Sequence, residues 1–152
     1  MGSQTILVAT LGGQPQVVTF ALDALLAQGE VVQAVDVLHP APIEARLQRS
    51  LDCLKQVVVQ QWYAGQSCTL QSFALARSGR SLVAMRDAAV ATLQTTHHLL
   101  ASLKNEGHKR HLCIAGGRRL MGLWVTSAVM LLRARCSAAF LPAWLLLEIT
   151  YE

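Results

Sequence analysis

The chain has few charged and few aromatic residues, and these shortages exclude several classes of protein. Charged residues make up 14% of the 152 residues and aromatic residues 5%, whereas hydrophobic residues reach 53%. No long run of lysine and arginine suggests binding to duplex nucleic acid. The longest apolar stretch, residues 138–147, contains Pro142 and is too short to cross a bilayer as a helix. We therefore expect a cytoplasmic protein that binds neither membranes nor duplex nucleic acid.

The common signatures of metal and nucleophile sites are also missing. The five histidines and four cysteines form no C-x-x-C, H-E-x-x-H or H-x-x-x-H pattern, and no serine lies in a G-x-S-x-G elbow. We expect no metal site and no cofactor. The residues 108–111 (His-Lys-Arg-His) read as a solvated basic turn. Because each cysteine lies in or beside an apolar run, we expect buried, reduced thiols at Cys53, Cys68, Cys113 and Cys136.

Length and charge favour one domain that binds a small anion. We treat residues 1–152 as a single domain and set aside residues 1–3, which resemble a cloning remnant. The net charge of +4 and the pI near 9.2 suit a nucleotide-sized anion better than DNA. A monomer of this size would have difficulty hiding so many hydrophobic residues, so we expect a large subunit interface and a homodimer.

Strand-like and helix-like patterns alternate along the chain, which predicts an α/β fold. We expect a Rossmann-like, mostly parallel sheet of about five or six strands with helices on both faces. The expected strands are residues 5–10, 34–38, 68–75, 111–115 and 139–149. The expected helices begin near residues 15, 43, 81 and 120 and end near residues 28, 58, 105 and 132. The last helix is apolar nearly all round and is our first candidate for the dimer contact.

Two glycine loops, each directly after an expected strand, are the strongest functional signal. The first is Gly12-Gly13-Gln14-Pro15 after Thr10 and Leu11, and the second is Gly116-Gly117-Arg118-Arg119. If the strand order is 3-2-1-4-5, both loops meet at the carboxyl edge of the sheet, where such folds bind ligands. Backbone amides of residues 10–13 and 116–117 could then hold an anion, and the arginine forks match phosphate oxygens. This pattern predicts a site for a phosphodiester, with His39 at the same edge.

Plainer interpretations of these residues remain open at this point. The first loop could be a tight structural turn, and both arginines could be solvated residues at the start of a helix. A structural role for His39 is as well supported as a ligand contact. A dinucleotide-dependent dehydrogenase is poorly supported, because G-x-G-x-x-G is missing and Asp36 lies inside the second expected strand.

The two loops resemble those of the CRISPR-associated Rossmann-fold (CARF) domains. The matching segments are residues 9–18 (ATLGGQPQVV) and 114–121 (IAGGRRLM), where family members tend to read A-T-L-G-T-S-P-x-x-V and A-G-G-R-K-x-M. The order of elements also fits over most of the chain. The resemblance implies a homodimer that binds a cyclic oligoadenylate across its two-fold axis, with Met121 among the ligand-binding positions. Stand-alone members of this kind are ring nucleases, and we expect this chain to be one of them, without an effector domain.

The resemblance also implies a metal-independent reaction. A ribose 2′-hydroxyl attacks the adjacent phosphate and leaves a 2′,3′-cyclic phosphate end, so the protein supplies geometry and charge. The family positions that do this work correspond to Arg119 and Gln14, with Arg118 beside them. Gln14 replaces a small hydroxyl residue, Arg119 replaces a lysine, and Gly13 stands where threonine is common.

We therefore expect a ring nuclease that cleaves cyclic tetra-adenylate and ends type III CRISPR signalling. One alternative is a non-catalytic sensor or sponge of the same fold that regulates a separate effector. A third class is an unrelated α/β enzyme or scaffold that binds a mononucleotide or another phosphate ester.

Overall fold

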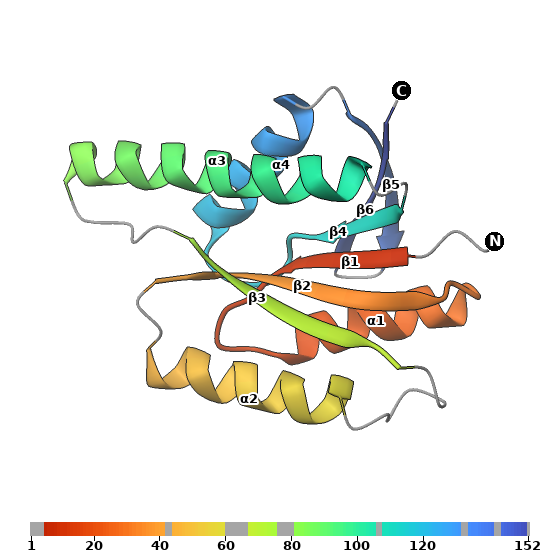
Figure 1. Ribbon diagram of the computed structural model, residues 1–152. Helices are drawn as coiled ribbons and strands as arrows, with labels where there is room; N and C mark the ends of the chain where they lie inside the picture. The colour runs from red at the N-terminus through yellow and green to blue at the C-terminus, as the bar shows by residue number, and fades with distance from the viewer. Residues whose placement is uncertain are drawn as a thin grey trace.

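The protein is a six-stranded α/β domain (Figure 1). The computed structural model describes residues 5–41, 44–59, 67–75, 81–105, 108–131, 134–141 and 144–151. The strands are β1 (Thr5–Thr10), β2 (Val32–Pro40), β3 (Thr69–Leu75), β4 (Lys109–Cys113), β5 (Ala134–Leu141) and β6 (Trp144–Tyr151). The helices are α1 (Gln16–Ala27), α2 (Ala45–Val59), α3 (Leu82–Asn105) and α4 (Arg119–Leu131).

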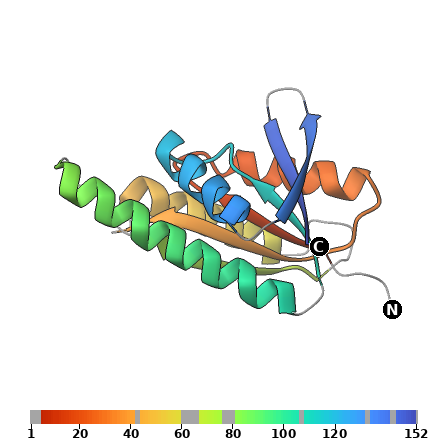
Figure 2. The ribbon, with the colours of Figure 1, turned by 90° about the horizontal axis from the view of Figure 1, so that it is seen from above.

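The sheet is mostly parallel and is covered by helices on both faces, as the sequence predicts. Its order is β3-β2-β1-β4-β6-β5, in which the first four strands pair in parallel and β6 pairs antiparallel with both β4 and β5. The helices α1 and α2 lie on one face and α3 and α4 on the other (Figures 1 and 2). No helix in the described ranges combines the length and the apolar character needed to cross a membrane.

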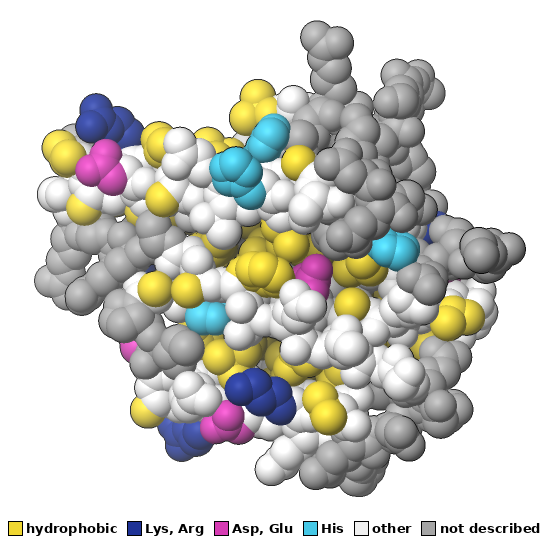
Figure 3. Space-filling model, viewed as in Figure 1, with side chains coloured by type: hydrophobic (Ala, Val, Ile, Leu, Met, Phe, Trp, Pro, Cys, Tyr) yellow, Lys and Arg dark blue, Asp and Glu magenta, His cyan; other side chains and the backbone are white. Residues whose placement is uncertain are grey.

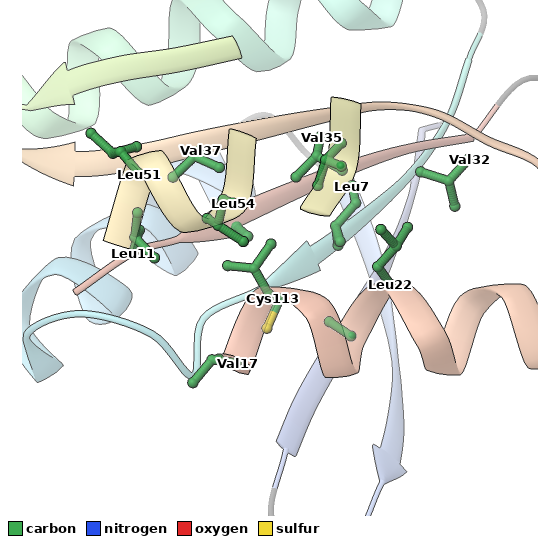
Figure 4. Close-up of a cluster of buried hydrophobic side chains, with 14 of the residues drawn as sticks. Leu7, Leu11, Val17, Leu22, Val32, Val35, Val37, Leu51, Leu54 and Cys113 are labelled. Carbon is green, nitrogen blue, oxygen red and sulfur yellow. The ribbon is translucent and has the colours of Figure 1, made fainter. Parts of the chain in front are cut away.

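The strand β1 is the centre of the packing, and every one of its six residues is buried. A strand covered by helices on both faces needs apolar side chains on both, which explains its continuous rather than alternating apolar pattern. The two faces carry separate cores. The core under α1 and α2 is drawn in Figure 4 and includes Leu7, Leu11, Val17, Leu22, Val35, Val37, Leu51, Leu54 and Cys113. The core under α3 and α4 includes Ile6, Val8, Leu38, Leu100, Leu112, Met121 and Val125.

Two expected helix boundaries are confirmed by their hydrogen bonds. Gly29 has a φ of 81° and ends α1, with its amide bonded to the Leu26 carbonyl and the next amide bonded to the Leu25 carbonyl. This pair of bonds is the Schellman arrangement, which favours glycine because of the positive φ. At the start of α3, the Ser81 hydroxyl oxygen accepts a hydrogen bond from the Ala84 amide at 3.1 Å.

The C-terminal part of the sheet differs from the sequence prediction. Instead of one strand over residues 139–149, the structure has two antiparallel strands, β5 and β6, and Pro142 lies outside the described residues between them. Residues 146–149 of the expected last strand pair with β4 as part of β6, as the sequence predicts, and β5 is an additional strand at the edge of the sheet. A proline has no backbone N–H to donate to a neighbouring strand. A strand that is hydrogen-bonded on both sides therefore does not continue through a proline.

The start of β4 is the second correction. The sequence predicts a solvated turn over residues 108–111, but β4 begins at Lys109, and Arg110 and His111 are only 2% and 3% exposed. Because β1 and β6 flank β4, its first residues are enclosed whatever their polarity. The polarity of these residues therefore predicts a solvated turn where the structure has the start of a strand. The strand β2 also runs further than expected and includes His39 and Pro40.

An ion pair ties the amino edge of the sheet together. The Lys109 ammonium contacts Glu30 Oε1, and the Thr5 hydroxyl donates to Glu30 Oε2 at 2.7 Å. These residues come from the starts of β4 and β1 and from the turn after α1. The hydrogen bond from Lys109 and, to a smaller extent, the hydrogen bond from Thr5 lower the pKa of the Glu30 carboxyl. The ionised carboxylate therefore stabilises this edge.

We expect Glu30→Gln to lower the free energy of unfolding by about 1 kcal/mol near neutral pH, because the variant lacks a part-buried charged hydrogen bond. Since the pKa of Glu30 is lowered in the folded state, its contribution is present above the unfolded pKa and disappears as the pH falls through the folded one. The wild type and the variant should therefore converge in acid. Urea unfolding of both proteins at about pH 7 and about pH 3 measures this; an equal difference at both pH values would contradict it.

Candidate functional site

The sheet order brings the two glycine loops together, as predicted. We call residues 11–15 the first loop and residues 114–119 the second loop, whose last residue, Arg119, is also the first residue of α4. They follow β1 and β4, which are parallel neighbours, so both loops leave the same edge of the sheet. The chain turns from β1 toward β2 and β3 on one side, whereas β4 lies on the other. This is the position where open α/β sheets bind ligands.

The two loops touch through their backbones. The position of a Cβ at Gly12 would lie 2.8 Å from the Cα of Gly117, and a Cβ at Gly116 would overlap the carbonyl oxygen of Thr10. Gly117 also has a φ of 77°, which side chains disfavour. Glycine is therefore required at these places for the loops to approach as closely as they do.

Hydrogen bonds at the ends of the strands hold this contact. The buried Thr10 hydroxyl donates to the Gly116 carbonyl at 2.6 Å and approaches the Cys113 carbonyl at 3.4 Å. The Leu11 amide donates to the Leu38 carbonyl at 2.8 Å. The side chain of Thr10 and the amide of Leu11 are thus engaged within the fold, and they form the base on which the loops rest.

The second loop presents two arginines at the start of α4. The Arg118 carbonyl accepts the amides of Met121 and Gly122, so the helix begins directly after it. Both arginine side chains are exposed, and within the described part of the chain neither makes an ion pair or a side-chain hydrogen bond. Positive charge at a helix N-terminus opposes the helix dipole, and α4 has no acidic residue in its first turn. An anion bound here would remove that repulsion.

The other predicted contact residues divide into exposed and buried positions. Gln14 is exposed on the first loop, where its side chain can reach a ligand. His39 is 2% exposed, and its Nδ1 lies 3.0 Å from the Pro40 carbonyl, which makes Nδ1 the protonated nitrogen. Met121 is buried in the core, with its methyl group directly beneath Gly117. Met121 therefore supports the second loop from below, whereas His39 is buried near the end of β2.

Two further arginines lie at this edge, and sequence reasoning missed them. A Cβ at Gly13 would overlap the Nε of Arg46, so the Arg46 side chain lies against the first loop. Gly13, Pro15, Arg46, Arg49 and Ser50 line an open pocket of about 310 Å³. The sequence signal is a pair of arginines in the first turns of the helix after β2, a strand that ends at the same edge as β1.

A larger hollow of about 650 Å³ lies elsewhere, between α3 and the sheet. Figure 3 shows hydrophobic side chains in this hollow between α3 and β3. Its lining includes the buried Asp36 together with His98, Gln71 and Phe73, but no residue of either glycine loop and no arginine or lysine. The hollow is therefore separate from the edge that suits an anion.

The raised pKa values of Cys68 and Cys113 disfavour a reactive thiolate at either residue. Burial raises the pKa of the Cys113 thiol, and burial followed by the charge of Asp36 raises the pKa of Cys68 to about 11. Cys53 is exposed on α2, so the expectation of buried thiols is wrong for that residue, and the side chain of Cys136 lies outside the described residues. Among the described residues, no three His, Cys, Asp or Glu side chains gather closely enough to hold a metal ion.

The close contact of the loops makes Gly116 a sensitive position. We expect Gly116→Ala to lower the free energy of unfolding by about 3 kcal/mol, because the new methyl group meets the backbone of β1 rather than a flexible side chain. Gly29→Ala is the matched control, since its methyl group would point into open space and only the positive φ would cost about 1 kcal/mol. Chemical denaturation of the two variants measures both values; equal losses of stability would argue against the described contact.

No curated protein matches the chain. Residues 14–137, which are more than half of the chain, match the family described as CRISPR-associated protein NE0113 (Cas_NE0113). This segment contains Gln14 and Pro15 of the first loop, all of the second loop and the four helices between residues 16 and 131. The protein therefore belongs to this CRISPR-associated family.

Proposed function

We propose that the protein is a ring nuclease that binds a cyclic oligoadenylate, specifically cyclic tetra-adenylate, and cleaves it. Loss of this second messenger would end type III CRISPR signalling. The observation that carries the proposal is the junction of two glycine loops with the exposed arginines Arg118 and Arg119 at the start of α4, which make no ion pair with any described residue. Membership of a CRISPR-associated family and the resemblance of both loops to CARF domains support the choice of ligand.

A second copy of the chain would complete the site. The helix α4 exposes a row of large apolar side chains, and Leu123 in its first turns is 60% exposed. The other members of this row are Leu120, Met130 and Leu131. Burying such a row is favourable, and a two-fold axis beside Leu120 and Leu123 would bring the second loops of both copies side by side. We infer a homodimer in which one ring contacts both subunits.

The proposed reaction is an in-line transesterification. The ribose O2′ forms a bond to the adjacent phosphorus as the bond from phosphorus to the next O5′ breaks, and solvent takes the 2′ proton and protonates the leaving oxygen. Arg118 and Arg119 would stabilise the extra negative charge on the phosphorane, and the Gln14 amide would orient the 2′-hydroxyl. Catalysis then rests on positioning and charge, because glutamine is no base and arginine is a poor proton donor near neutral pH.

The side chains of Gln14 and Arg119 also favour a second candidate function. A site with Gln14 and Arg119, and without a titratable base among the exposed loop residues, could bind the ring without cleaving it. The protein would then act as a sensor or sponge, and the apolar row on α4 could contact an effector. The product distinguishes the candidates: linear fragments identify an enzyme and an intact ring identifies a sensor.

The first test is incubation of the purified protein with cyclic tetra-adenylate in EDTA, with chromatographic separation of products and parallel measurement of binding. We expect linear di-adenylate with a 2′,3′-cyclic phosphate end, because attack by the 2′-hydroxyl needs no added water. Tight binding of the ring without cleavage would contradict the nuclease proposal and support the sensor. If the protein neither binds nor cleaves cyclic tetra-adenylate or rings of other sizes, both candidate functions are overturned.

The second test concerns the arginines of the second loop. We expect Arg118→Ala and Arg119→Ala each to weaken binding of cyclic tetra-adenylate by about tenfold or more, because each removes a charge-assisted hydrogen bond. Lys55→Ala is the matched control, since it removes one exposed positive charge from the middle of α2. Calorimetric titration measures the affinities. If both loop variants bind as the control does, the second loop is not the ligand site.

A further inference from the structure

The first loop has a second cationic side that the proposed reaction does not use. Gly12 faces Gly117 of the second loop, whereas the next residue, Gly13, faces Arg46 at the start of α2. The first loop therefore lies between two groups of arginines, with Arg118 and Arg119 beyond one glycine and Arg46 and Arg49 beyond the other.

The pocket beside Gly13 is built from positive charge that the described residues leave unbalanced. Arg46 and Arg49 are exposed and make no ion pair or side-chain hydrogen bond within the described part of the chain. The first turn of α2 carries no acidic residue, and the nearby Asp52 accepts a hydrogen bond from Gln48 at 2.9 Å. Two like charges held close together repel each other, so an anion between them would be stabilising.

Backbone packing places this charge beside the loop. A side chain at residue 13 would occupy the space that the Arg46 guanidinium group fills. Ser50 is 3% exposed, and its hydroxyl donates to the Arg46 carbonyl at 3.2 Å, so the turn that carries Arg46 is anchored. At about 310 Å³ the pocket is at the lower end of small-molecule sites, which suits one part of a ligand that continues beyond it.

We propose that Arg46 and Arg49 bind a second phosphate of the ligand whose first phosphate lies against Arg118 and Arg119. The ligand then crosses the first loop, over Gly12 and Gly13, where no Cβ stands in the way. The site therefore selects oligonucleotides with two or more linked phosphates over ligands with one. This inference rests on the proposed function and names the feature by which that site recognises its substrate class.

The test uses Arg46→Ala and Arg49→Ala in the full chain, with cyclic tetra-adenylate as the ligand. We expect each variant to bind about tenfold more weakly, and the slope of log affinity against log salt to fall by about 0.7 for each phosphate that the variant no longer neutralises. Arg46→Lys retains the charge and should recover part of the affinity. Lys55→Ala, on the same helix but away from the pocket, should bind as the wild type does. Circular dichroism checks that each variant is folded.

A ligand with a single phosphodiester, the linear dinucleotide ApA, separates the two groups of arginines. Its affinity is measured by competition with cyclic tetra-adenylate. We expect Arg118→Ala to weaken the binding of ApA, whereas Arg46→Ala should change its affinity by less than about twofold. If the wild type binds no cyclic oligoadenylate, the proposed function fails. If the wild type binds and Arg118→Ala weakens binding, while the Arg46 and Arg49 variants match Lys55→Ala in affinity and salt slope, only this inference is overturned.

Discussion

At residues 12, 116 and 117 two stretches of backbone touch with no side chain between them, and the arrangement of the carboxyl edge of the sheet depends on that contact. It can form only because β1 and β4 are neighbours, which requires the chain to place β2 and β3 on one side of β1 and return to the other. The Thr10 hydroxyl then joins the two strand ends through the Gly116 carbonyl. The arginines at the start of α4 are carried on this junction, so their position follows from packing rather than from loop flexibility.

The charged residues at the two edges of the sheet differ in whether they have a partner of opposite charge. At the amino edge, Lys109 is paired with Glu30, and the neighbouring Arg110 is enclosed inside β4. At the carboxyl edge, the arginines of α2 and α4 are exposed and have no partner among the described residues. Compensated charge stabilises the fold, whereas uncompensated charge of one sign creates a potential that attracts an anion. The modest net charge of the chain conceals this separation.

The sequence predicted the parts of the fold that follow from local patterns. Continuous apolar runs located β1, and Gly29 and Ser81 marked helix ends, because these signals act over a few residues. The convergence of the loops also followed, since parallel strands end at one edge. Arg110 and His111 were misplaced because burial at the start of β4 depends on its neighbours, β1 and β6. Arg46 was missed because its contact with Gly13 joins residues 33 positions apart, and no local pattern encodes that distance.

The contact between Gly13 and Arg46 means that the residues at these two positions cannot vary independently. A threonine at position 13 would displace the guanidinium group from its place against the loop. Relatives with a side chain at this position should therefore carry a shorter or uncharged residue at the position of Arg46, and relatives with glycine should retain a basic one. Correlated substitution at these two positions would then record which relatives share this contact.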